Sequence, residues 1–222
     1  MGAGIWSKWE IIPINKIINM KNYILFLFLF TLGMFAQERF ELKAHGITFE
    51  RPDGWLTAED RAFRENIEKF GWTEKQAEEL KNQSSTANVT AFYKYDSKTY
   101  RGIIPTLNLT TGPNPTKTFA QFKQMVANSH AQFKKVLNDF KVVSEAKEMV
   151  VDGRKAIMET TSYMLNGPDG PTMIKSCMLC FTKDKYYYTL SLVEEAGKED
   201  NMVIFDQVIK TIRIGDKSVS KK

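Results

Sequence analysis

Four extended runs in the second half of the chain, separated only by short turns, constrain the fold most strongly. Each run has the alternating, β-branched and aromatic pattern that favours a strand. The connections are Asp152-Gly153, the loop from Asn166 to Gly170, and Lys183-Asp184. Strands joined by such short connections run antiparallel. The sequence therefore predicts a four-stranded antiparallel meander built from residues 141–151, 155–165, 172–182 and 186–193.

Three more strands and up to four helices are predicted around this meander. The strands cover residues 47–51, 87–95 and 103–111, and the prolines and glycine of 112–115 are expected to end the last of these. The helices cover 59–70, 74–82, a long segment capped by Thr116, and 199–211. The long helix has an apolar stripe of Phe119, Phe122, Val126, Phe133 and Leu137. These elements predict an α+β fold, an antiparallel sheet of about six to seven strands with helices packed on it.

Residues 20–36 have the order of a secretory signal peptide. Lys21 is followed by seven consecutive apolar residues from Ile24 to Phe30, and Ala36 is the expected last residue before cleavage. The apolar stretch covers 14 residues, whereas a membrane-spanning helix needs about 20. We therefore expect export to the periplasm or the extracellular medium, with membrane contact only through the uncleaved segment.

Residues 1–19 do not fit a signal peptide. One interpretation is that translation starts at Met20 and that these residues are a mis-called extension, and the other is an unusually long n-region. Cleavage after Ala36 leaves 186 of the 222 residues, enough for a full core. We expect a lead segment at 37–45, one domain at 46–214 and a disordered polar tail at 215–222.

The charge of the chain does not indicate a nucleic-acid partner. The formal net charge is +5, and residues 1–36 contribute Lys8, Lys16 and Lys21 against Glu10, which leaves +3 after cleavage. Lys and Glu are interspersed along the remaining chain, as on an ordinary solvated surface. We therefore expect no nucleic acid among the partners.

Cys177 and Cys180 have the C-x-x-C spacing of redox proteins. They fall within a predicted strand, where residues three apart point to opposite faces and lie about 10 Å apart. A disulfide needs Cα atoms within about 7 Å. The sequence therefore favours two separately packed free cysteines, and a thiol oxidoreductase stays an alternative.

Other chemistry-bearing residues are sparse. The two histidines, His45 and His130, have no ligand spacing with each other or with the cysteines. The sequence contains no G-x-S-x-G, G-x-G-x-x-G or G-x-x-x-x-G-K motif. We therefore expect no catalytic, cofactor-binding or metal-binding residues and no cofactor, although a site assembled in space from Ser or carboxylate residues stays open.

The run from Tyr186 to Tyr188 offers a candidate contact surface. On a strand, Tyr186 and Tyr188 share one face, and Tyr187 lies on the other. Cross-strand aromatic packing is the favoured interpretation. Tyr187 and Trp72 are the candidate residues for contact with a ligand or partner.

Short motifs across residues 46–214 resemble the PsbP-like family. They are Ile47-Thr-Phe-Glu-Arg-Pro-Asp-Gly-Trp55, Val151-Asp-Gly153 before a long strand, Tyr187-x-Thr-Leu, and Phe205-x-x-Val-Ile-x-Thr-Ile212. Phe49, Pro52, Trp55 and Gly153 are the fold-signature residues, and the stretch 56–82 departs from the family pattern. The resemblance implies an α/β/α sandwich around an antiparallel sheet, no catalytic residues, and a role as a binding or assembly module.

These observations predict an exported, non-enzymatic binding or assembly-accessory protein of the bacterial cell envelope. Its expected partner is an envelope protein or a small apolar ligand. Two alternatives remain, a carrier with an apolar cavity between sheet and helices, and a thiol oxidoreductase that uses Cys177 and Cys180.

Overall fold

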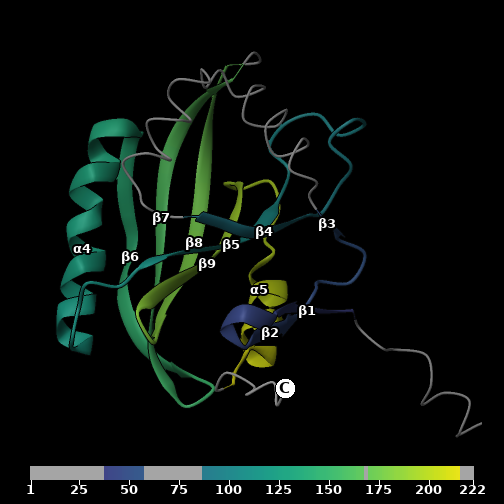
Figure 1. Cartoon of the computed structure of the whole chain (residues 1–222). Coiled ribbons are helices and arrows are strands. Elements are labelled where there is room, and N and C mark those ends of the chain that lie inside the picture. Colours follow the sequence, from purple (N-terminus) through teal and green to yellow (C-terminus); the bar gives the residue numbers. More distant parts are fainter. Residues whose placement is uncertain (1–37, 58–86, 168–169, 216–222) are drawn as a thin grey trace, which may run out of the picture. The chain divides into compact units, whose positions relative to one another are not determined.

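The computed structural model describes residues 38–57, 87–167 and 170–215 (Figure 1). The predicted signal segment 20–36, the helices at 59–70 and 74–82, Trp72, and the tail after residue 215 lie outside the described residues. Among the residues that are described, no helix is long and apolar enough to span a membrane.

The main sheet has seven strands in the order β3-β4-β5-β9-β8-β7-β6, and every neighbouring pair is antiparallel. The predicted meander is confirmed, and its strands are longer than predicted: β6 (Asn138–Val151), β7 (Arg154–Gly167), β8 (Gly170–Lys183) and β9 (Tyr186–Glu195). Asp152 and Gly153 form the first turn with φ angles of 46° and 76°. This left-handed pair of residues suits a two-residue hairpin, because its twist matches that of the flanking strands.

The other half of the main sheet differs from the prediction at β5. β3 (Leu56–Thr57), β4 (Ala87–Tyr93) and β5 (Thr106–Pro113) form this half. Ile103 and Ile104 are buried but precede the strand, and β5 continues through Gly112 and Pro113, the first two of the four residues expected to end it. Pro113 is tolerated because it is the last residue of the strand. The next backbone hydrogen bond is made by Asn114, whose N–H donates at 2.8 Å to the carbonyl of Lys185 in the turn between β8 and β9.

A second sheet of three short strands accompanies the main sheet. β1 (Arg39–Leu42) and β10 (Arg213–Ile214) pair antiparallel with opposite edges of β2 (Ile47–Glu50). A one-turn 3₁₀ helix, η1 (Lys43–His45), connects β1 to β2. Part of the predicted lead segment is thus ordered structure that pairs with β2.

The two described α-helices are α4 (Phe119–Val136) and α5 (Met202–Thr211). The prediction that Thr116 caps the long helix was wrong, because Thr118 does so. The Thr118 hydroxyl accepts from the Gln121 N–H at 3.2 Å, and the Gln121 side chain accepts from the Thr118 N–H at 3.3 Å. This reciprocal pair is a capping box. α5 begins at Met202 rather than at residue 199.

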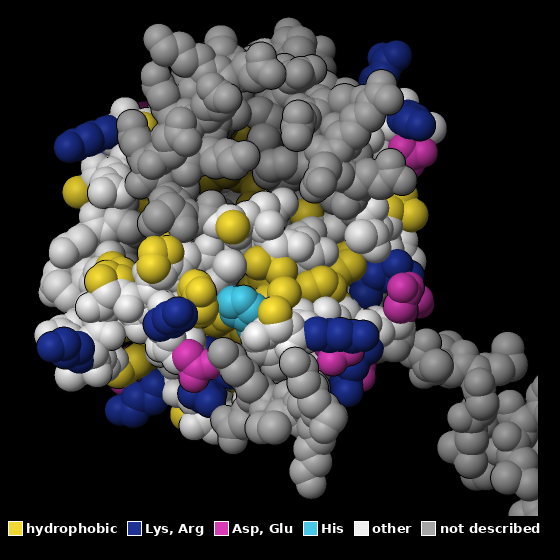
Figure 2. Space-filling model, viewed as in Figure 1, with side chains coloured by type: hydrophobic (Ala, Val, Ile, Leu, Met, Phe, Trp, Pro, Cys, Tyr) yellow, Lys and Arg dark blue, Asp and Glu magenta, His cyan; other side chains and the backbone are white. Residues whose placement is uncertain are grey.

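The helices cover opposite faces of the main sheet. α5 and the small sheet lie on one face and enclose the larger hydrophobic core, which includes Phe49, Trp55 and Phe205. α4 lies on the other face alongside β6 (Figure 1) and forms a smaller cluster with Ile157 and Cys180. Hydrophobic side chains form a band across the face shown in Figure 2, with charged side chains around it. The predicted α+β class, with helices packed on an antiparallel sheet, is confirmed.

Candidate functional site

The four fold-signature residues occupy structural positions. Phe49 and Trp55 are buried in the larger core, and Pro52 is buried at the turn between them. The Pro52 carbonyl accepts from the Trp55 N–H at 3.2 Å, which turns the chain after β2. Gly153 lies at the β6–β7 turn with a positive φ. These contacts position the core and leave little of these side chains for a ligand.

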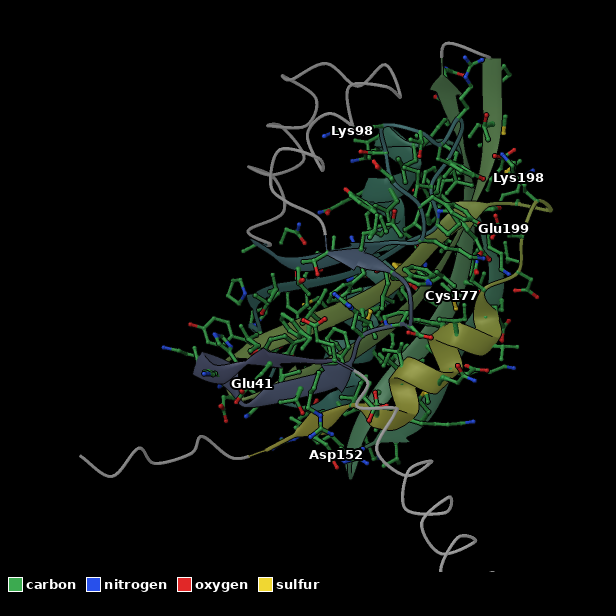
Figure 3. All side chains as sticks on the ribbon, turned by 90° about the vertical axis from the view of Figure 1, so that its right-hand side faces the viewer. Glu41, Lys98, Asp152, Cys177, Lys198 and Glu199 are labelled. Carbon is green, nitrogen blue, oxygen red and sulfur yellow. The ribbon has the colours of Figure 1, made fainter. Side chains whose placement is uncertain are left out.

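The two cysteines lie on opposite faces of β8. Cys177 belongs to the core that α5 covers (Figure 3), and Cys180 belongs to the cluster beneath α4. Both are free and buried, so the prediction of two separately packed cysteines is confirmed. Burial raises the pKa of Cys177, and it raises the pKa of Cys180 to about 12. Such thiols remain protonated near neutral pH and are poor nucleophiles.

The tyrosine run divides between the two faces as predicted. Tyr188 is fully buried and stacks on Phe181 with ring centroids 5.4 Å apart. Tyr187 lies on the α4 side, where its ring packs directly over Gly112. A Cβ atom at position 112 would meet the Tyr187 hydroxyl at 2.8 Å. The Tyr187 ring therefore packs across the strand pair on a glycine, and the second candidate contact residue, Trp72, lies outside the described residues.

A buried carboxylate–imidazole pair beneath α4 was not predicted. His130 Nε2 lies 3.0 and 3.1 Å from the two carboxylate oxygens of Glu159, whose side chain is 1% exposed. The sequence carried a weak signal of this pair. His130 interrupts the apolar stripe of the long helix, and Glu159 alternates with the apolar residues of β7. A buried carboxylate needs such a partner because desolvation penalises an unpaired charge.

Further polar residues lie in line with Glu159 across the sheet. Glu159 of β7 pairs with Met178 of β8. The row continues through Ser191 of β9 to Asn108 of β5. Ser191 is buried, and the buried Oδ1 atom of Asn108 has no hydrogen-bond partner among the described residues. The α4 side of the sheet is thus partly polar.

A charged network fixes the connection between β9 and α5. Glu199 accepts hydrogen bonds from Lys94 and from the Tyr95 hydroxyl, and the Lys94 ammonium is the main cause of the lowered pKa of Glu199. The buried Glu194 carboxylate accepts from the backbone and side-chain N–H groups of Asn201 at 3.1 and 2.8 Å. Figure 3 shows Lys198 and Glu199 near one end of α5 and Asp152 near the other. These contacts position the helix, which is a structural role.

A groove of about 480 Å³ lies between α4 and the adjoining β6 and β7 strands. Its lining residues are Phe119, Ala120, Lys123, Gln124, Ala127, Glu148 and Lys155. Lys123 Nζ lies 2.9 Å from Glu148 Oε1, and Lys155 Nζ lies 5.4 Å from the centre of the Phe119 ring. The hydrogen bond and charge of Lys123 lower the pKa of Glu148, and the charge of Lys155 adds to this effect.

The chemistry of this groove is that of a binding surface. Two ammonium groups face one carboxylate, next to an aromatic ring and small apolar side chains. The described parts of the chain contain no cluster of three His, Cys, Asp or Glu side chains that could hold a metal ion. The groove was missed from the sequence because Lys123, Glu148 and Lys155 come from three different elements.

Comparisons with known proteins identify structural likenesses. No family model matches the sequence, and no curated protein matches it. Among solved structures, cyanobacterial PsbP from Synechocystis sp. PCC 6803 matches with a TM-score of 0.48 and 13% identity, over 82% of this chain and 96% of that chain. A protein of unknown function from Pseudomonas aeruginosa matches with a TM-score of 0.45 and 13% identity, over 81% and 97% of the two chains.

LpqN from Mycobacterium tuberculosis, a protein involved in cell envelope biogenesis, matches with a TM-score of 0.41 and 14% identity, over 81% of this chain and 87% of that chain. These are likenesses of fold. A PsbP is among the solved structures that this chain resembles.

Proposed function

We propose that this protein is an exported, non-enzymatic binding or assembly-accessory protein of the bacterial cell envelope. Export is inferred from residues 20–36, whose charged, apolar and small-residue order is typical of a signal peptide with cleavage after Ala36. The binding surface that we assign to it is the α4–β6 surface, defined as α4, strand β6 and the groove between them.

The open edge of β6 is the observation that carries this proposal. β6 is the last strand of the main sheet and has 14 residues, so one side of a long strand has no neighbouring strand in the described sheet. Val143 and Val150 of β6 are 62% and 66% exposed, and Val136 and Val142 are also exposed. A long open strand edge is a template for pairing with another chain, and the exposed valines of β6 lie along it.

The two alternatives fit this geometry less well. A carrier of small apolar molecules needs an apolar cavity, whereas the groove at α4 includes Lys123, Glu148 and Lys155. A thiol oxidoreductase needs a reactive thiolate, whereas Cys177 and Cys180 are buried on opposite faces with raised pKa values.

Crosslinking and affinity capture from the envelope fraction of the source cells test the proposal. The test variant is Val143→Asn/Val150→Asn, which leaves the charge unchanged. The control is Val203→Asn, because Val203 is 69% exposed on α5, on the opposite face of the sheet. We expect wild type and the control to capture the same envelope protein and the double variant to lose it. Capture of the same proteins by all three, or of none, contradicts the proposal.

A further inference from the structure

The positive charge of this protein is concentrated on the α4–β6 surface. Helix α4, strand β6 and the groove residue Lys155 contain six Lys and three Asp or Glu, a net charge of +3, whereas the whole chain has +5. Helix α4 itself contains three lysines and no acidic residue. A surface with this balance attracts negatively charged partners and repels positive ones.

Within this surface, two lysines of the groove lie near the same carboxylate, that of Glu148. Lys123 of α4 and Lys155 of β7 both act on the Glu148 carboxylate. Lys123 and Glu148 remain about half exposed, so their ion pair is open to solvent. A carboxylate from another molecule can compete for both ammonium groups, because a solvent-exposed ion pair contributes little free energy.

The part of β6 next to the groove is also its most regular part. Residues Lys147–Val151 pair with β7 in unbroken register, whereas the register shifts three times between Asn138 and Lys147. Bulges of that kind hinder the addition of another strand. An added strand is therefore accommodated best along 147–151, where the exposed Val150 is directly opposite Lys155.

From these observations we propose that the α4–β6 surface binds an extended acidic segment of a partner protein. The segment adds to the edge of β6 along residues 147–151. Because side chains alternate along a strand, a Glu or Asp of the segment lies on the α4 side beside Glu148, within reach of Lys123, and an apolar neighbour on that side covers Val150. This inference rests on the proposed function and names the partner's chemistry.

The charge of the surface also decides between occupants. A second copy of this chain would bring a surface of net charge +3 against another of +3, and like charges across an interface cost free energy. An anionic lipid surface matches the charge but offers no strand for the backbone of β6 and does not enter a groove between a helix and a strand. The acidic segment matches the charge, the groove and the strand edge together.

Fluorescence anisotropy with a labelled peptide of repeated Glu-Glu-Val-Val tests this inference, because Glu and Val then alternate along each face of the bound strand. We expect saturable binding at low salt that weakens as the ionic strength rises, and no comparable binding by the same peptide with Gln in place of Glu. Lys123→Gln and Lys155→Gln should each weaken the peptide's affinity by about two- to fivefold, the effect of one exposed ion pair. Lys210→Gln is the matched control, because Lys210 is exposed on α5.

Glu148→Gln has the opposite expected sign. It removes the internal competitor for both lysines, so the acidic peptide should bind about two- to fivefold more tightly. A merely structural role of the ion pair would give no gain in affinity. Equal affinities for the Glu and Gln peptides, or unchanged affinity in both lysine variants, would overturn the inference.

Two further measurements separate this inference from its rival and from the proposed function. Vesicles containing phosphatidylglycerol that bind more tightly than the acidic peptide, with the same loss in the lysine variants, would overturn it in favour of a lipid surface. If Lys123→Gln/Lys155→Gln still captures the envelope protein that Val143→Asn/Val150→Asn loses, the acidic segment is wrong and the proposed function stands.

Discussion

At the scale of single residues, the buried pair formed by His130 and Glu159 matters for stability. The Glu159 side chain is 1% exposed, and His130 is the partner that satisfies both of its oxygens. Removing one member of a buried pair leaves an uncompensated polar or charged group, which typically costs about 3–5 kcal/mol. The free energy lost when one member of the pair is removed is therefore larger than the net free energy that the intact pair contributes.

We predict that His130→Ala lowers the free energy of unfolding by about 3 kcal/mol or more. Urea unfolding followed by circular dichroism measures the loss. Gln132→Ala is the control, because Gln132 is an exposed residue of the same helix and should change the free energy of unfolding little. A His130→Ala variant as stable as the control would show that Glu159 is satisfied in another way.

Cys180 makes the stability dependent on pH in the alkaline range. Its pKa is about 12 in the folded protein, against about 8.5 for an unperturbed thiol. Above pH 8.5 the unfolded chain loses this proton while the folded chain keeps it, so the free energy of unfolding falls as the pH rises. The effect is absent below pH 8.5 and increases until the pH reaches the folded-state pKa.

We therefore predict that, between pH 7 and pH 10, wild type loses about 2 kcal/mol more stability than Cys180→Ala does. The packing lost in the variant cancels, because it is present at both pH values. Urea unfolding at the two pH values measures the difference. An identical loss in both proteins would mean that the Cys180 thiol already ionises in the folded state as it does in an unfolded chain.

The sequence predicted single residues well where a local period decides their position. Strand alternation was enough to place Cys177 and Cys180 on opposite faces and Tyr187 opposite to Tyr188. It could not pair His130 with Glu159, because the period of an element gives the face of a residue but not the residue that it meets on another element. The same limit applies to Lys123, Glu148 and Lys155 in the groove.

At the scale of elements, the start of α4 provides a direct test of the corrected helix cap. Thr118 and Gln121 form the capping box, whereas the Thr116 hydroxyl lies 2.6 Å from Asn114 Oδ1 in the preceding turn. We predict that Thr118→Ala lowers the free energy of unfolding by about 1 kcal/mol, and Thr116→Ala by less. Urea unfolding of the two variants measures both losses. A larger loss of free energy of unfolding in Thr116→Ala than in Thr118→Ala would mean that Thr116 is the residue that caps α4.

Two of the strands that the sequence missed, β3 and β10, are short and pair with residues far away in the chain. The long strands β6 to β9 were predictable because two-residue turns fix their neighbours. β10 has two residues and pairs Ile214 with Ile47, far away in the chain. A two-residue strand has no period to detect, and its partner depends on the complete fold. The predicted end of β5 was wrong because Gly112 and Pro113 still pair with the start of β9. A local proline or glycine signal does not show how far the neighbouring strand extends.

At the scale of the whole molecule, a buried lysine joins the two ends of the described chain to the main sheet. Lys183, at the end of β8, is 3% exposed and donates to the backbone carbonyls of His45 and Gly215. The Gly215 N–H in turn donates to the Gly46 carbonyl at 2.9 Å, and the Asp152 carboxylate accepts from the Ile214 N–H. The segment after α5 is thus held by groups from β8, from the β6–β7 turn and from the start of β2.

The charge of Lys183 is what makes this arrangement strong, since hydrogen bonds from charged donors contribute about 1.5–3 kcal/mol each. Replacement by Met keeps the apolar stem and removes the donor, so both carbonyls lose their shared partner. We predict that Lys183→Met lowers the free energy of unfolding by about 2–3 kcal/mol and speeds hydrogen exchange at the Gly215 amide. Lys185→Met is the matched control, because Lys185 is exposed in the same turn. If both variants unfold at the same urea concentration and the Gly215 amide exchanges at the wild-type rate, the ends of the domain are held by β-strand pairing alone and Lys183 does not contribute.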